Sequence, residues 1–529
     1  MAHLFSQVPR AEIQRSSFNR DHTLKTAIDS NYLIPIYVDE VLPGDTFNLE
    51  AALFGRLSTP VVPIMDNLYL DTFFFFVPSR LVWENWQRFN GEQDDPGDST
   101  DFIIPTVACD GKSGTIYDYF GIPYLEGNGA ADGTTIEVNS LPLRAYNLIW
   151  NEWFRDENLQ NSVDVPKDDG PDASTDFILL KRGKRHDYFT SALPWPQKGP
   201  GVELPLGSFA PVLTRSVDIP GQTSQSPMIL RDQNGSTAPR TRNLGTGTSG
   251  EVFVNGDYDT PGNARYHIAN MWADLSSATS ATINSLRQAF QLQRLYERDA
   301  RGGSRYTEIL RSHFGVVSPD ARLQRPEFLG GSSTRVNINP VTQQSATDST
   351  SPQGNLAAFG VVGDKIHGFN KSFVEHGYVI GLVNLRADLN YQQGLNRMWS
   401  RRTRFDFYWP VLAHLGEQAI LNKEIFADGS SADEDVFGYQ ERYAEYRYFP
   451  NLITNKLRST DPNSLDVWHL AQKFDNLPTL SDAFISENVP LARSLAVQNE
   501  PQLILDVFFK LNCVRPMPVY GVPGLVDHF

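Results

Sequence analysis

Cysteine is nearly absent from this 529-residue chain, which contains only Cys109 and Cys513. Two cysteines exclude a framework of disulfides, although a single bridge between them stays possible. The chain also lacks any run of about 18 apolar residues, so we expect no membrane-spanning helix. Its first residues, MAHLFSQVPR, contain no apolar signal-peptide core, so we do not expect secretion. Together these absences predict a soluble protein that is finished in a reducing cytosol.

Positive charge is also scarce. Lysine and arginine number 46 against 62 aspartates and glutamates, which gives a net charge of −16 and a pI near 5.1. A protein whose main task is to coat phosphates carries the opposite charge. Any contact with a nucleic acid is therefore expected to be local.

Signatures of reactive sites are missing as well. The ten histidines lie far apart in sequence and neither cysteine has a near partner, so no local zinc signature can be written. Residues 245–250 (GTGTSG) match the dinucleotide motif in letters, but no apolar strand precedes them and no amphipathic helix follows. The sequence Gly111-Lys112-Ser113 is similar to the end of a phosphate loop, but the first glycine of that motif is missing. We therefore predict a turn at these residues. Without a G-x-S-x-G either, we predict no enzyme, catalytic residue, cofactor or metal site. A triad or metal site assembled across the fold stays open.

Acidic residues gather in three polar segments that are marked by glycine or proline. The segments contain Asp94, Asp95 and Asp98, then Asp168, Asp169 and Asp172, and then Asp433, Glu434 and Asp435. Oxygen-rich loops can bind a hard cation such as calcium, but none of these has the spacing of an EF-hand. Solvated loop charge is the interpretation that we favour.

Aromatic residues and prolines, by contrast, are abundant. Phe, Trp and Tyr make up 12% of the chain and prolines number 34, which is typical of many short strands joined by irregular loops. The sequence therefore predicts a mainly β protein. Its length exceeds the roughly 250–300 residues at which one core stops growing. We favour a single domain over residues 1–529, in which long segments are inserted into one sheet system.

Alternating apolar residues predict strands near both ends of the chain. Residues 46–54 and 503–513 place apolar side chains on one face. Residues 68–77 (LYLDTFFFFV) are apolar on both faces, as in a strand that is covered on each side. Residues 33–38 include Pro35, which cannot donate to a ladder, and predict an edge strand or an arm against a neighbour. Because long strands lie near both ends, we expect the terminal segments to pair in one antiparallel sandwich.

Helical spacing occurs between these strands. We predict helices over residues 79–89, 143–153, 283–301 and from there to Gly315. In the second helix the spacing indicates that Trp150 and Trp153 are buried anchors. In the third helix an apolar stripe is expected to point inward, and it contains Leu286, Ala289, Phe290 and Tyr296. The last two helices form a predicted helical insertion over residues 276–315.

Two polar stretches interrupt these patterns. Residues 207–269 are rich in Gly, Ser, Thr, Pro, Asn and Gln and lose apolar periodicity, which predicts a polar surface insertion. This insertion is either a binding surface or an exposed loop without a partner. Residues 330–355 predict another exposed loop.

Cations gather at two places despite the acidic balance. The first group contains Lys181, Arg182, Lys184 and Arg185, and the second contains Arg397, Arg401, Arg402 and Arg404. Trp399 and Phe405 lie within the second group. Cations interleaved with aromatic rings suit a single nucleic-acid strand, whose phosphates attract charge and whose bases stack. Ion pairing between subunits is the alternative that we favour, and one inner surface can do both.

Seven blocks spread over the chain carry a resemblance to one family. They are residues 31–47 (NYLIPIYVDEVLPGDTF), 141–158 (LPLRAYNLIWNEWFRDEN), 184–200 (KRHDYFTSALPWPQKGP), 282–315, 373–410 (FVEHGYVIGLVNLRADLNYQQGLNRMWSRRTRFDFYWP), 438–451 (GYQERYAEYRYFPN) and 514–529 (VRPMPVYGVPGLVDHF). These blocks resemble the major capsid proteins of gokushovirus-type microviruses (Microviridae), which are small single-stranded-DNA phages. Matches at both ends and at five places between them predict collinear similarity over the full length.

The resemblance implies a fold, a function and partners. It implies an eight-stranded viral jelly roll, an antiparallel β-sandwich or barrel, with long loop and helical insertions. The subunit is expected to form a T = 1 icosahedral capsid, a virion shell around a circular single-stranded DNA genome, in the cytoplasm of a bacterial host. An internal scaffolding protein, a small basic DNA-binding protein and a DNA pilot protein are the implied partners. Residues 207–269 resemble the loop that forms a protrusion at each threefold axis, which implies contact with a host surface receptor.

A protein of another class is the alternative. Nine tryptophans and many acidic residues also fit a β-sandwich carbohydrate-binding protein or glycosidase. Sugar platforms need exposed aromatic rings, whereas four tryptophans lie in or beside helical stripes that predict burial, namely Trp83, Trp86, Trp150 and Trp153. A glycosidase is active as a small soluble species, while a capsid protein forms large closed particles.

Overall fold

The main sheet belongs to one of two compact units. The computed structural model describes residues 13–202, 283–317, 324–345, 347–349 and 352–521, together with the backbone of six short strands between residues 212 and 273. The first unit comprises Met1–Pro196 and Ala300–Phe529 and contains the main sheet, and the second comprises Gln197–Asp299.

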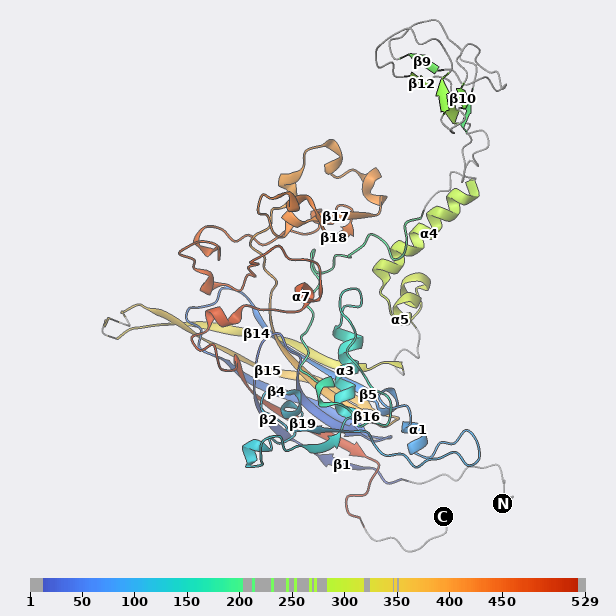
Figure 1. Cartoon of the computed structure of the whole chain (residues 1–529). Helices are drawn as coiled ribbons and strands as arrows, with labels where there is room; N and C mark the ends of the chain where they lie inside the picture. Colours follow the sequence, from blue (N-terminus) through green and yellow to red (C-terminus); the bar gives the residue numbers. More distant parts are fainter. Residues whose placement is uncertain are drawn as a thin grey trace. The chain divides into compact units, whose positions relative to one another are not determined.

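Nine described strands form this sheet, and all of their pairs are antiparallel. They are β1 (Ser16–Asn19), β2 (His22–Ile28), β3 (Ile34–Val41), β4 (Thr46–Leu57), β5 (Leu68–Pro78), β14 (Glu327–Thr342), β15 (Leu356–Ser372), β16 (Gly377–Ala387) and β19 (Leu503–Arg515). Their order is β1-β19-β4-β15-β14-β5-β16-β3, and β2 also pairs with β19. The sheet curls into a half-barrel (Figure 1). This architecture confirms the predicted mainly β fold of the jelly-roll type.

Strands from the two ends of the chain meet in this sheet. β19 pairs with β2, where Leu503 stands opposite Ile28, and with β4, where Leu503 stands opposite Leu57. Buried and more exposed side chains alternate along β4 and β19. The predicted pairing of the terminal segments in one sheet is confirmed.

β5 separates two hydrophobic cores. Phe74 and Phe76 belong to the cluster that the curled sheet encloses. Phe75 and Val77, on the opposite face, pack in a second cluster with helix α3 (Leu141–Ile149), which contacts β5 and β16 (Figure 1). Successive side chains of a strand point to opposite faces, so a strand between two cores is apolar throughout. The prediction that residues 68–77 are covered on both sides is confirmed.

β3 lies at one end of the strand order, where its described strand partner is β16. Pro35 stands opposite Leu382, beside an irregularity in the register of this pair. A residue without an N–H is tolerated at such a position because one edge of the strand needs no ladder partner. The predicted edge strand is confirmed.

The helix predicted to begin near residue 143 is present as α3, with Pro142 in its first turn and a wider turn over Trp150–Phe154 after it. Trp150 is buried as expected. Trp153 is 38% exposed, so its expected burial is wrong. Its indole N–H donates to the carbonyl of Pro326 at 2.9 Å, and the guanidinium of Arg325 lies 4.3 Å from its ring centroid. Helical spacing predicts that Trp150 and Trp153 share one face of the helix, but it does not predict that Arg325 covers the ring of Trp153.

The single helix predicted over residues 79–89 is wrong. Two short turns, Ser79–Leu81 and α1 (Trp86–Phe89), stand in its place. Trp83 lies between them and is fully buried, and its indole N–H donates to the carboxylate of Asp169 at 2.7 Å. A long-range contact of this kind overrides a local helical pattern.

The two helices predicted before Gly315 are present as α4 (Ile283–Gly302) and α5 (Tyr306–Ile309), which continues as a turn over Leu310–Phe314. The expectation that the stripe of α4 points inward is wrong for Leu286 and Phe290, which are 37% and 65% exposed. Spacing shows which side chains share a helix face, and not whether anything covers that face.

The exposed loop predicted over residues 330–355 is wrong for its first part. Residues up to 342 belong to β14, which pairs with β5 and then with β15. Gly331 permits close contact with β5, since a Cβ at this position would lie 2.2 Å from the carbonyl oxygen of Thr72. The glycines that favoured a loop in the sequence therefore mark a close approach between strands.

Most of residues 207–269 lie outside the described residues, as do residues 247–250 of the GTGTSG motif. In the second unit the backbone forms three two-stranded ribbons. They join β8 (Val212–Thr214) to β13 (Met271–Ala273), β9 (Leu230–Asp232) to β12 (Tyr266–Ile268), and β10 (Leu244–Thr246) to β11 (Val252–Val254). The surface insertion and the helical insertion over residues 276–315 stay predictions.

Shorter elements complete the first unit. β6 (Thr106–Cys109) pairs with β7 (Ile136–Asn139), β17 (Glu417–Leu421) pairs with β18 (Val436–Glu441), and single helical turns are formed by α2 (Ile116–Tyr119) and α7 (Asp482–Ile485). Both cysteines are buried and free. In the described part of the chain, no helix has the length and apolarity that crossing a membrane requires.

Candidate functional site

The first basic segment is fixed on both sides by backbone hydrogen bonds. Arg182 donates its N–H to the carbonyl of Asn31 at 2.9 Å, and Lys184 donates its N–H to the carbonyl of Ile485 at 2.7 Å. Segments that are far apart in sequence thus hold residues 181–185 in an extended conformation, so their side chains alternate in direction.

Arg182 points into the fold rather than toward solvent. It donates to the carboxylate of Asp71 at 2.5 Å, and Arg386 donates to the same oxygen at 2.7 Å. Burial alone would raise the pKa of Asp71. Hydrogen bonds from Ser333 and the two arginines outweigh burial, so the pKa of this carboxyl lies below its ordinary value. Arg182 is therefore neutralised within its own chain.

Lys184 also points inward and is 8% exposed. Its Nζ donates to the side-chain oxygen of Gln472 at 3.0 Å and lies 4.3 Å from the ring centroid of Phe484. Burial lowers the pKa of this amine to about 8. Lys181 and Arg185 are exposed. The four cations therefore divide into an inner pair and an outer pair.

A cavity of about 600 Å³ lies beside this segment. Its wall includes the aromatic rings of Phe75, Trp153 and Phe328, whose centroids lie 5.4 to 6.0 Å apart. Charged residues of both signs also line the cavity, and they include Arg185 as well as Glu157 and Glu308, which both pair with Arg305. The cavity therefore combines aromatic rings with charged side chains of both signs.

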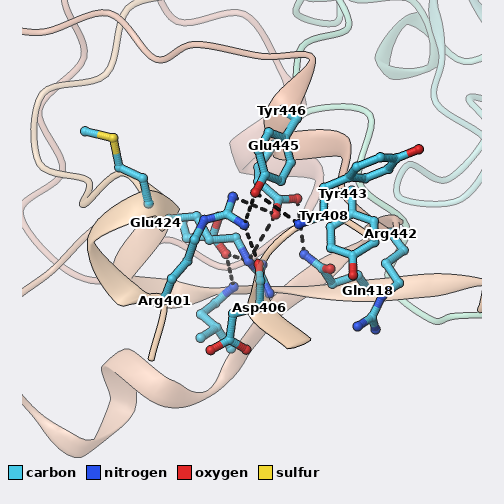
Figure 2. A network of polar contacts seen from close by, with 12 residues as sticks. Arg401, Asp406, Tyr408, Gln418, Glu424, Arg442, Tyr443, Glu445 and Tyr446 are labelled. Carbon is cyan, nitrogen blue, oxygen red and sulfur yellow. Dashed lines mark hydrogen bonds and ion pairs between the residues drawn. The ribbon is translucent and has the colours of Figure 1, made fainter. Parts of the chain in front are cut away.

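In the second basic segment, two arginines are held by carboxylates of the same chain. Arg397 donates to Glu424 at 2.8 Å, and Arg401 pairs with Glu445 at 3.2 Å. The guanidinium of Arg401 also lies 4.2 Å from the ring centroid of Tyr446 and donates to its hydroxyl at 2.7 Å (Figure 2). Figure 2 shows Arg401 in one polar network with Glu445 and Tyr446, which belong to the segment that follows β18. Both arginines thus hold the segment in place.

Arg402 and Arg404 are exposed. The guanidinium of Arg404 lies 4.7 Å from the ring centroid of Trp409, and that of nearby Arg442 lies 4.9 Å from the ring of Tyr443. Within the described residues, none of these three arginines forms an ion pair. Arg402 and Arg442 line a second cavity, of about 630 Å³. Their positive charge is available to a partner.

The acidic segments behave differently from one another. The side chain of Asp172 is buried against Arg144, so the expectation of solvated loop charge is wrong for this residue. Asp169 accepts the indole N–H of Trp83 but is exposed. Asp94 and Asp95 are exposed, as favoured. In the described part of the chain, no group of three His, Cys, Asp or Glu side chains is arranged to hold a metal ion.

Sequence reasoning missed the residues that organise both basic segments. Asp71 and Arg386 are separated by 315 positions, and Arg401 and Glu445 by 44. A lone carboxylate in an apolar strand, such as Asp71 within LYLDTFFFFV, is the one local signal, because a buried charge requires a partner. The sequence does not indicate which arginine that partner is.

The curled antiparallel sheet with long inserted segments defines a protein of the jelly-roll fold class. Trp83 and Trp150 are buried and hence offer no sugar platform, whereas Trp399 is 72% exposed. A sequence profile described as capsid protein (F protein) matches residues 6–525, and the chain belongs to this family of phage capsid proteins. The family match, rather than burial of the rings, disfavours the carbohydrate-binding alternative.

Three named relatives are similar over nearly their whole length. Capsid protein VP1 of Bdellovibrio phage phiMH2K is 50% identical, and the alignment covers 100% of this chain and 98% of the relative. Capsid protein VP1 of Chlamydia phage 1 is 44% identical, with coverage of 99% and 98%. Capsid protein VP1 of Spiroplasma virus 4 is 40% identical, with coverage of 99% and 97%. The predicted resemblance to gokushovirus-type capsid proteins is confirmed, and with it a structural role in a capsid.

Proposed function

We propose that this chain is the subunit of a closed T = 1 icosahedral shell that encloses a circular single-stranded DNA genome. The observation that carries the proposal is the collinear similarity to capsid proteins over residues 6–525. A closed shell requires each subunit to present several different contact patches, and the long segments inserted between the strands provide such surface. No chemical step is needed for this work, so the proposed role is structural and not enzymatic.

The two basic segments have a divided role in this proposal. Lys181, Arg185, Arg402 and Arg404 are exposed and are proposed to contact the genome or neighbouring subunits at the inner surface. The inward cations are proposed to hold these segments in position, and they are Arg182, Lys184, Arg397 and Arg401. The net charge of −16 supports a local contact rather than a coat of positive charge around the DNA.

Further partners and one further site belong to the proposal. Residues 207–269 are proposed to form a threefold protrusion that contacts a host surface receptor. An internal scaffolding protein, a small basic DNA-binding protein and a DNA pilot protein are proposed to join the subunit in the host cytoplasm. The acidic charge of the chain supports the small basic partner, because such a partner would neutralise phosphates that an acidic coat leaves uncovered.

Expression of the chain alone and with a scaffolding partner tests the proposal. Sedimentation velocity and negative-stain microscopy measure the mass and the shape of the products. Uniform closed particles of one small diameter, with DNA that resists nuclease, are expected. Monomers or dimers in every condition, with the partner included, would overturn it.

A further inference from the structure

The second basic segment and the residues that follow it expose many large apolar side chains. We call this surface the aromatic surface, and it consists of Trp399, Phe405, Phe407, Tyr408, Trp409 and Val411. The exposed fraction is 72% for Trp399, 62% for Phe405 and 86% for Val411. Exposed apolar groups that gather in one place mark an interaction surface, whereas isolated ones need no explanation.

The aromatic surface is held from beneath and is therefore not a slack loop. Tyr408 donates its backbone N–H to the hydroxyl of Tyr446 at 3.2 Å, and its ring packs 5.2 Å from the ring of Tyr443 (Figure 2). Arg401 donates to the carbonyl of Asp406 and to Tyr446. Tyr446 and Glu445 thus fix the segment through its backbone and through Arg401. Tyr408 and Trp409 also make contacts inside the subunit, whereas Trp399, Phe405 and Val411 expose most of their side chains.

Two observations identify the kind of partner. Arg402 and Arg404 stand at this surface without an ion pair among the described residues, while each copy of the chain carries a net charge of −16. A second copy of this acidic chain would supply the complementary charge. Val411 and Leu415, which is 62% exposed, are aliphatic and cannot stack on a nucleobase as an aromatic ring does. Aliphatic, aromatic and arginine side chains together are typical of the core of a protein–protein interface.

We propose that a second copy of this chain covers the aromatic surface, with its apolar side chains at the centre of the contact and Arg402 and Arg404 paired to acidic groups of the neighbour. This inference rests on the proposed shell and assigns the second basic segment to contact between subunits rather than to the genome. Trp399, Phe405 and Val411 contribute the most exposed apolar side chains of this contact.

Serine substitution of three outward residues tests the inference. The variant carries Trp399→Ser, Phe405→Ser and Val411→Ser. The rings of Trp399 and Phe405 do not pack on another described ring. The melting temperature of the unassembled subunit is therefore expected to stay unchanged. A matched control carries three substitutions at equally exposed positions elsewhere, namely Ile103→Ser, Val374→Ser and Tyr520→Ser. We expect the yield of closed particles to fall at least about tenfold for the variant and to stay unchanged for the control. Normal particle yield from the variant would overturn the inference, and most clearly if DNA content per particle fell instead.

A crosslinking experiment separates this inference from the proposed shell. A photo-reactive phenylalanine analogue replaces Phe405 in an equal mixture of ¹⁴N-labelled and ¹⁵N-labelled chains, and crosslinked peptides are identified by mass spectrometry. Peptide pairs of mixed label are expected, because the partner is another copy. Such pairs without any closed particle would support the contact and contradict the shell. Crosslinks to DNA, or pairs of one label only, would overturn the contact even where shells form.

Discussion

Arg144 donates from Nε and Nη2 to the two carboxylate oxygens of Asp172, at 2.7 and 2.6 Å, and both side chains are buried. Its Nη1 also donates to the carbonyls of Val82 and Asp168, at 3.1 and 2.9 Å. One guanidinium group therefore ties α3 to the segment after β5 and to residues 168–172. A charge-assisted, bidentate pair of this kind is among the stronger polar contacts in a protein.

Removal of one partner from the Arg144–Asp172 pair should destabilise the folded subunit. Asp172→Asn leaves the buried charge of Arg144 with only a 3.4 Å contact to the exposed carboxylate of Asp168, so we expect the free energy of unfolding to fall by about 3 kcal/mol. Urea denaturation of the unassembled subunit, followed by tryptophan fluorescence, measures this change. Asp94→Asn is the control, because Asp94 pairs with Arg88 at 3.4 Å on the surface and should change stability by less than about 0.5 kcal/mol. Equal effects of the two substitutions would contradict this account.

Glu487 should make stability depend on pH. Burial raises the pKa of its carboxyl to about 8, against the opposing charges of Arg182 and Arg386, from an ordinary value of 4.5. The folded state thus binds this proton more tightly than the unfolded chain does. The resulting stabilisation is complete below pH 4.5 and is lost as the pH rises through about 8.

Glu487→Gln removes this titration. Compared with the unaltered chain, the variant should gain stability as the pH rises from 5 to 9, which thermal melts of the unassembled subunit at a series of pH values will reveal. The charge of Glu487 raises the pKa of Lys184, so the difference between the two chains reports Glu487 together with its effect on this amine. If the melting temperatures of the two chains change in parallel from pH 5 to 9, the pKa of Glu487 is not raised into this range.

Gly331 should not accept even the smallest side chain. A Cβ at this position would lie 2.2 Å from the carbonyl oxygen of Thr72, which belongs to the backbone of the paired strand. We expect Gly331→Ala to lower the free energy of unfolding by about 1–3 kcal/mol, as overpacking does. Gly521→Ala is the control, since a Cβ there meets nothing within 4 Å. Chemical denaturation of both variants provides the comparison, and a neutral Gly331→Ala would mean that β14 lies further from β5.

The two thiols should react only after unfolding. Cys109 and Cys513 are buried and free, and burial raises the pKa of both. The thiol is the unreactive form, so a colorimetric thiol reagent at pH 8 should detect no thiols in the folded subunit and two in guanidinium chloride. Detection of none after denaturation without a reductant would indicate a disulfide.

Residue patterns predict the strands of this fold better than its polar contacts. The alternation in β19 and the double apolar face of β5 are local properties of the chain, because each strand's own side chains report what covers it. The partner of Asp71 is not local, since Arg386 lies 315 positions away. The division of each basic group into inward and outward cations is likewise set by distant carboxylates such as Glu445. The tryptophans show the same limit, because Trp153 shares the helical spacing of Trp150 but is covered by Arg325.

The pairing of β19 with β2 and β4 has a consequence for synthesis of the protein. A ribosome makes residues 503–515 long after residues 22–57. β2 and β4 therefore lack their partner strand β19 while most of the chain is still being synthesised, and their edges stay unpaired. Free strand edges are sites of aggregation. Prematurely terminated chains therefore lack the strand that closes this sheet, and we expect them to be removed by chaperones and proteases before they compete with intact subunits.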